Sequence, residues 1–147
     1  MPSAPTTTVS GSNVVISWAA PNNNGSPIVG YVIQIRQSDG VTFSVDITSC
    51  DGSKSTIREA TSCSVPITTL RASTYQLPWG SSIYAQLYAY NIYGNSLMSS
   101  VGNGAIILTI PDSPLSAAEL YSSRTATSIG LQWSIGVANG GAPVIDY

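Results

Sequence analysis

The residues that could carry out chemistry in this chain are few: two cysteines, seven carboxylates and no histidine. Without histidine, nucleophiles activated by an imidazole are excluded, together with most catalytic zinc sites. The spacing of the acids forms no carboxylate pair of the glycosidase kind. The sequence therefore predicts a protein that is not an enzyme and that needs no cofactor.

The segment from Thr48 to Ser62, which is rich in turn residues, contains Cys50 and is followed directly by Cys63. Three interpretations compete: a disulfide, two free buried thiols, or part of a metal site. A metal such as zinc would need further cysteine or histidine ligands. A bridge would close a loop for which chain entropy predicts about 3 kcal/mol of stabilisation. We therefore favour a disulfide and an oxidising compartment.

The remaining polar candidates lie at expected turns. Asp39 and Asp51 each precede a glycine and Asp46 ends a strand, so a turn role is favoured over a calcium site built from all three. Asn24 begins an Asn-Gly-Ser triplet on an expected exposed loop, which makes it a candidate for N-glycosylation, although Pro27 follows directly.

Composition narrows the class of protein. The chain has 147 residues, only 8% are charged and the net charge is −2, so Ser, Thr, Asn, Gly and Tyr take the place of charged residues. No basic patch is present, which argues against nucleic-acid binding. The longest apolar run, Ala105 to Ile110, is too short to span a bilayer, and no signal-peptide core follows Met1. If the protein is secreted, its signal should lie outside this stretch.

The most strongly patterned segment, Ile83 to Gly94, alternates at a period of two, which predicts a strand. One face carries Ile83, Ala85, Leu87 and Ala89, and the other carries tyrosines. A strand with one apolar face needs a second layer to cover it, so we expect an all-β sandwich. In it, Trp18 and Leu87 should lie buried opposite each other.

Further strands are expected on both sides of this one. They are an edge strand at Thr6 to Val9 after a proline-rich start, then Asn13 to Trp18, Ile28 to Arg36, Val41 to Ile47, Ser64 to Leu70 and a closing strand at Ala105 to Ile110. Pro66 should place its strand at an unpaired edge or a bulge, because it has no N–H.

These residues together resemble a fibronectin type III domain, over Pro2 to Ile110. The resemblance rests on Pro2-x-x-Pro5, the inward Trp18, Ile28-x-x-Tyr31-x-Ile33, Leu77-Pro78-x-Gly80 and Leu87-x-Ala89-x-Asn91-x-x-Gly94. It implies a seven-stranded antiparallel immunoglobulin-like β-sandwich. There are two departures. The tyrosine whose hydroxyl forms the corner hydrogen bond in this family would fall on Ile83, so that bond is missing unless Tyr84 makes it from a shifted register. The Cys50 to Cys63 segment is also unusual for the family. No Arg-Gly-Asp triplet is present, so the integrin binding of some members does not carry over.

The module then begins again, which predicts one domain at 1–110 and the first part of a second at 111–147. Three segments resemble earlier ones. Pro111-x-x-Pro114 repeats Pro2-x-x-Pro5, Ile129-x-Leu131-x-Trp133 repeats Val14-x-Ile16-x-Trp18, and Asn139 to Tyr147 repeats Asn24 to Tyr31. The second copy lacks a counterpart of the Ile83 to Gly94 strand. A longer chain, an artificial truncation, or strands supplied by a neighbouring subunit would each explain this.

One surface stands out as a candidate interface. Its residues should point outward from two neighbouring strands, namely Tyr84, Tyr88, Tyr90, Val32, Gln34 and Arg36. Tyrosines are enriched at interfaces, but they also stabilise sheets by packing across strands, so both interpretations stay open.

We expect a non-enzymatic structural and interaction module of a larger extracellular or cell-surface protein. It would act as a spacer or adhesive repeat, self-associating or contacting neighbouring repeats, with lateral packing into a filament or coat favoured by the low charge. The alternative is a ligand- or carbohydrate-binding receptor ectodomain that uses the loop at Asn22 to Ser26 and the Thr48 to Ser62 segment.

Overall fold

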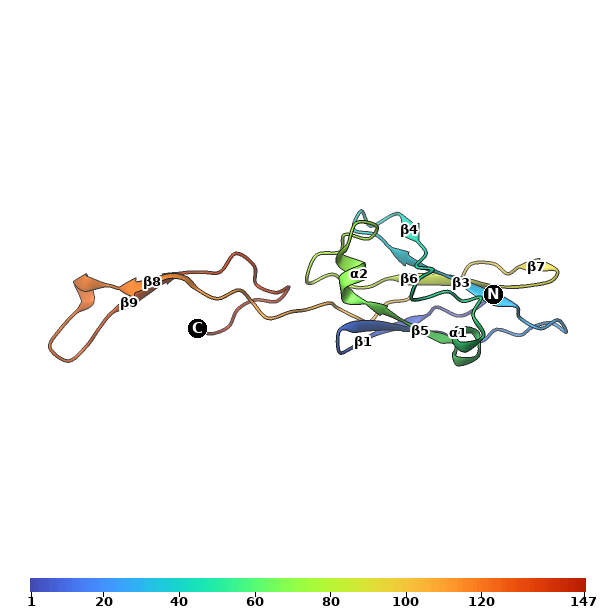
Figure 1. Cartoon of the computed structure of the whole chain (residues 1–147), viewed down its shortest axis with the longest axis horizontal. Helices are drawn as coiled ribbons and strands as arrows, with labels where there is room; N and C mark the ends of the chain where they lie inside the picture. Colours follow the sequence, from blue (N-terminus) through green and yellow to red (C-terminus); the bar gives the residue numbers. More distant parts are fainter. The chain divides into compact units, whose positions relative to one another are not determined.

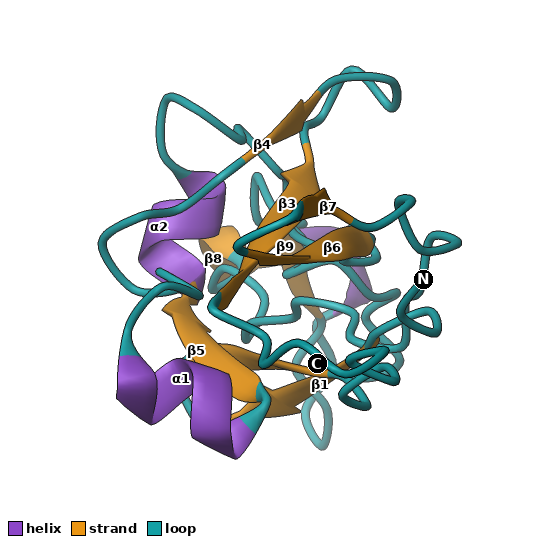
Figure 2. Cartoon of the chain, turned by 90° about the vertical axis from the view of Figure 1, so that its right-hand side faces the viewer, coloured by secondary structure: helices purple, strands orange, loops and turns teal.

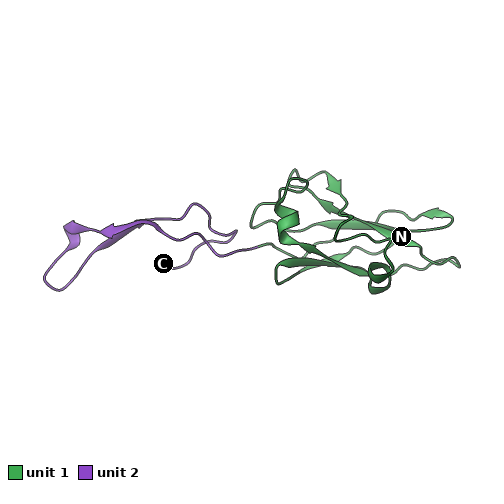
Figure 3. Ribbon diagram, in the orientation of Figure 1, with its two compact units in different colours: residues 1–107 green, residues 108–147 purple.

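The computed structural model describes residues 1–147, which form two compact units, Met1–Ile107 and Leu108–Tyr147 (Figure 3). Most of the regular structure and the buried core belong to the first unit. The two units are described separately.

The first sheet of unit 1 has three antiparallel strands in the order β1-β2-β5. They are β1 (Thr6–Ser10), β2 (Asn13–Ser17) and β5 (Ser62–Pro66). Val14 and Ile16 of β2 and Val65 of β5 are fully buried, and their neighbours in sequence are less so. Since β5 pairs only with β2, Pro66 does lie on an edge strand, where its missing N–H breaks no ladder.

The second sheet has the order β4-β3-β6-β7. It contains β3 (Gly30–Arg36), β4 (Phe43–Ser44), β6 (Ala85–Asn91) and β7 (Gly94–Asn95). Figure 1 shows the two sheets of unit 1 as two layers. The predicted immunoglobulin-like β-sandwich is confirmed.

The core lies between these layers. Trp18 is 6% exposed and Leu87 is fully buried, as predicted. The Trp18 ring meets Tyr31 edge-on, with centroids 5.2 Å apart, an arrangement that adds to the stabilisation from buried area.

The closing segment differs from the expected continuous strand. It joins the sheet through two isolated bridges, Ser82 to Ile106 and Ala85 to Gly102, and Ile110 belongs to the second unit. The segment also runs beside the start of the chain so closely that a Cβ on Gly102 would lie 1.6 Å from the Pro5 carbonyl oxygen. Glycine is therefore required there.

Two short helices were not predicted. They are α1 (Ser55–Ala60), inside the segment between the cysteines, and α2 (Ile67–Arg71), which replaces the second half of the expected Ser64 to Leu70 strand. Both lie against β5 (Figure 2). The expected strand at Val41 to Ile47 shortens to β4, because Asp46 accepts the Thr48 N–H at 3.0 Å and turns the chain.

The corner position of the family holds a buried isoleucine, since Ile83 is fully buried. Tyr84 does not replace the missing hydroxyl. It lies on the opposite face, where the Arg36 guanidinium stacks 3.6 Å from the centre of its ring.

Unit 2 contains β8 (Leu115–Glu119), the 3-10 helix η1 (Tyr121–Ser123) and β9 (Leu131–Ser134), with β8 and β9 antiparallel. Two local features of unit 1 recur in it. Trp133 meets Tyr147 at 5.8 Å, as Trp18 meets Tyr31, and the Asn139 side chain accepts the Gly141 N–H, as Asn23 accepts that of Gly25.

Burial differs sharply between the two units. Ile129, Leu131 and Trp133 are 69%, 66% and 45% exposed, whereas their counterparts Val14, Ile16 and Trp18 are buried. The boundaries of the two predicted modules stay a prediction, although the division into compact units falls near them.

Candidate functional site

Cys50 and Cys63 form a disulfide with their Cα atoms 5.1 Å apart, as predicted. Cys63 belongs to β5 of the first sheet. Two residues after Cys50, the Gly52 carbonyl accepts the N–H of Tyr31 in β3 of the second sheet, at 3.1 Å. The bridge therefore links the two layers through the segment that follows β4.

The aspartates serve their own turns. Asp39 accepts hydrogen bonds from the Thr42 hydroxyl and from the N–H groups of Val41 and Thr42, which together hold the pKa of its carboxyl below the ordinary value. The Ser53 hydroxyl and N–H lower the pKa of Asp51 in the same way. These acids are not brought together, and no group of three or more His, Cys, Asp or Glu side chains is placed to hold a metal ion.

The candidate interface lies on β3 and β6, where Val32 pairs with Tyr88 and Gln34 pairs with Gln86. The Gln86 amide donates to the Gln34 side-chain oxygen at 2.8 Å, and the only cation, Arg36, lies over Tyr84. We call Val32, Gln34, Arg36, Tyr84, Gln86 and Tyr88 the tyrosine face. Its residues are all half-buried. Its role as an interface stays a prediction.

Tyr90, also predicted for this face, has a particular environment. It pairs with Gly30, and a Cβ on Gly30 would lie 2.5 Å from the Tyr90 hydroxyl oxygen. The ring therefore covers the glycine, an arrangement known to compensate for a missing side chain in a sheet. This places Tyr90 at the end of the sandwich where the 21–28 loop meets the hairpin of β6 and β7.

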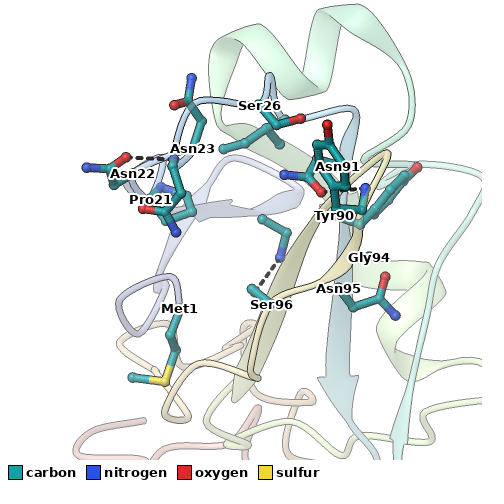
Figure 4. A pocket seen from close by; sticks show the side chains of 14 residues that line it. Met1, Pro21, Asn22, Asn23, Ser26, Tyr90, Asn91, Gly94, Asn95 and Ser96 are labelled. Carbon is teal, nitrogen blue, oxygen red and sulfur yellow. Dashed lines mark hydrogen bonds between the residues drawn. The ribbon is translucent and has the colours of Figure 1, made fainter.

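A hollow of about 380 Å³ lies at that end (Figure 4). We call it the asparagine hollow, because five of its lining residues are Asn22, Asn23, Asn24, Asn91 and Asn95. Tyr90, Tyr93, Ser26 and Ser96 also line it, and no charged side chain does. Its volume lies within the range of small-molecule sites, about 300 to 1,000 Å³.

Local turns hold three of these asparagines. The side-chain oxygens of Asn22, Asn23 and Asn91 accept backbone N–H groups two residues further on, at 2.8, 3.0 and 2.9 Å. Such turns are typical of asparagine and fix its side chain. Sequence reasoning singled out the loop at Asn22 to Ser26 but missed Asn91, Tyr93 and Asn95. The turn signal at Asn91 to Asn95 could have placed them at a strand end, but not opposite the other loop.

Asn24 lies exposed on this loop with φ of 51°, a conformation that asparagine tolerates better than most residues. Glycosylation at Asn24 stays a prediction. No helix in the structure has the length and apolar character that crossing a membrane would require.

The sandwich and its loops define an immunoglobulin-like module, and the chain belongs to the fibronectin type III family. The family model described as "Fibronectin type III domain" matches residues 2–101. The expected resemblance is confirmed. A search of curated proteins finds no match.

Several solved structures are similar to this chain. Domains A168–A170 from titin show 19% identity and a TM-score of 0.47, covering 72% of this chain and 32% of theirs. Titin kinase and its flanking domains show 16% identity and a TM-score of 0.49, covering 71% of this chain and 16% of theirs. The twitchin kinase region from C. elegans shows 21% identity and a TM-score of 0.45, covering 68% of this chain and 15% of its own. This chain thus spans a third or less of each.

The family assignment concerns a module of larger proteins that is generally structural rather than catalytic. Some of the similar structures do include kinases, by their descriptions. The disulfide is compatible with an extracellular location.

Proposed function

We propose that this chain is a non-enzymatic spacer and interaction module of a larger extracellular or cell-surface protein, and that copies of it pack side by side through the tyrosine face. The observation that carries the proposal is the chemistry of this face. The single cation of the face, Arg36, is stacked on Tyr84. The rest of the face presents aromatic and amide groups, which can approach another surface without electrostatic repulsion.

The disulfide supports the proposed location, because such bonds persist in oxidising compartments. The recurrence of the aromatic pair and the asparagine turn in unit 2 supports a repeated module. A repeated, weakly charged module suits a spacer, since each copy adds length and presents the same face again.

Tyr88→Ser tests the proposal, because Tyr88 is one of the two tyrosines of the tyrosine face and pairs with Val32. We expect the variant to weaken self-association at least tenfold in sedimentation-equilibrium measurements, with a smaller effect on folding. Tyr93→Ser is the matched control, because Tyr93 is 85% exposed and lies outside the face.

A monomer at all concentrations would contradict lateral packing. If Tyr88→Ser lowers the free energy of association and the free energy of unfolding by equal amounts, the face only stabilises the sheet.

The second candidate function is ligand binding, and the asparagine hollow favours it. The expected receptor loop at Asn22 to Ser26 lines the hollow together with residues of the β6 and β7 hairpin. The Thr48 to Ser62 segment, also expected to bind, does not line it.

A further inference from the structure

The asparagine hollow offers hydrogen-bond donors whose direction is fixed. Each amide side chain has one acceptor oxygen and one NH₂ donor group. In Asn22, Asn23 and Asn91 the oxygen already accepts a backbone N–H, while the NH₂ groups have no partner within the chain. Asn23 and Asn91 come from opposite sides of the hollow, and the Asn91 amide nitrogen points toward the 21–26 loop (Figure 4).

This arrangement selects the chemistry of a ligand. Because the turns orient the side chains and use one lone pair of each oxygen, the NH₂ groups are the polar groups of these side chains that have no partner, and a ligand with acceptors matches them. The lining side chains are all uncharged, and the only charge beside the hollow is the N-terminal ammonium of the largely exposed Met1, so the asparagine side offers a carboxylate or phosphate no opposite charge to compensate for lost hydration. The best match is therefore a neutral acceptor such as an amide carbonyl.

The apolar surfaces of the hollow add a second requirement. Ile28 and Ala89 line it, together with the rings of Tyr90 and Tyr93. Tyr90 is held against Gly30, whereas Tyr93 is largely exposed. An exposed aromatic ring beside amide donors suits a ligand with both an apolar face and polar substituents.

We propose that the asparagine hollow binds a neutral oligosaccharide that carries acetamido groups. The Asn23 and Asn91 amides donate to an acetamido carbonyl oxygen, and the Tyr93 ring packs on the apolar face of a sugar. This inference rests on the second candidate function, ligand binding at the hollow, and is independent of packing through the tyrosine face.

The test compares three probes on the whole chain by isothermal titration calorimetry: chitotriose, which carries acetamido groups, cellotriose, which lacks them, and an uncharged glycine-serine hexapeptide. We expect chitotriose to bind at least about tenfold more tightly than either of the others, since its acetamido carbonyls find fixed donors. Amide chemical shifts in NMR should change at residues 22–26 and 91–95.

Substitution by aspartate removes the donor and keeps the turn, because aspartate accepts the same backbone N–H. We expect Asn23→Asp and Asn91→Asp each to weaken chitotriose binding about tenfold, with unfolding by urea unchanged. Asn139→Asp is the matched control, because Asn139 makes the same turn in unit 2 without lining the hollow. It should leave binding unchanged.

Three results would overturn the inference: no binding of chitotriose, equal binding of chitotriose and cellotriose, or tighter binding of the hexapeptide. The absence of chitotriose binding would contradict ligand binding of this kind at the hollow, but it would not bear on self-association through the tyrosine face. The second removes the role of the acetamido group. The third assigns the donors to a peptide backbone.

Discussion

Thr7 illustrates how one polar side chain can hold the two sheets together. Its hydroxyl donates to the Ile83 carbonyl at 3.0 Å and accepts the Ala105 N–H at 2.9 Å, and the residue is 1% exposed. Buried backbone groups without a partner are costly, so these two bonds satisfy atoms that the short ladder of the closing segment leaves free.

Thr7→Val should therefore destabilise unit 1 although the two side chains have nearly the same shape. It leaves the Ala105 N–H and the Ile83 carbonyl buried without this partner, which should lower the free energy of unfolding by about 2 to 3 kcal/mol in urea titrations. Thr8→Val is the matched control, because Thr8 is exposed on the same strand, and should change stability by less than about 0.5 kcal/mol. Equal effects of the two variants would show that Thr7 acts only through its size.

Sequence periodicity could predict apolar residues such as Trp18 and Leu87, because burial repeats every two positions along a strand. It could not predict the role of Thr7. The partners of its hydroxyl lie 76 and 98 positions away in sequence, so no local pattern records them. The same holds for the asparagine hollow, whose two sides meet only once the sheet has formed.

At the scale of elements, the long strands were predictable and the short helices were not. Ile67 and Leu70 are spaced as on a helix, but Val65 and Ile67 are spaced as on a strand, and the second spacing predicts that the strand continues. α1 has no fully buried residue, so its six residues show no clear apolar stripe. Both helices depend on contacts with β5 that the sequence does not reveal.

The disulfide should be the main constraint on the α1 segment. Its cysteines are separated by 13 positions, and replacing both with alanine should lower the free energy of unfolding by about 3 kcal/mol. Urea titrations of the double variant, compared with the unmodified chain with and without dithiothreitol, measure this. Reduction should bring the unmodified chain close to the variant. A reduced chain as stable as the oxidised one would show that the bridge contributes little.

At the scale of the whole molecule, the same motif occurs in two different environments. Trp18 and Trp133 each contact a tyrosine near the end of their repeated segment, but only Trp18 is buried between two sheets. The sequence could predict this repeat, because a repeat is recognised from similar residues about one module apart along the chain and requires no knowledge of contacts.

The two tryptophans should therefore respond differently to truncation. Trp18→Ala should lower the free energy of unfolding by about 3 to 5 kcal/mol in urea titrations, whereas Trp133→Ala should change it by less than about 1 kcal/mol. Repeating the titrations over a range of protein concentrations provides the control. A concentration-dependent loss in Trp133→Ala would indicate that a second copy supplies the strands that cover β9.

The first and last segments of unit 1 have a mechanical consequence. Pro5 lies beside Gly102 and Thr7 beside Gly104, so the two segments run in the same direction and are joined by the bonds of Thr7 to Asn103 and Ala105. Tension applied through Met1 and Ile107 would slide one segment along the other and load these bonds in shear, all at once instead of in succession. Resistance to stretching then depends on the rate at which this small group of bonds ruptures, and not on the total stability of the sandwich.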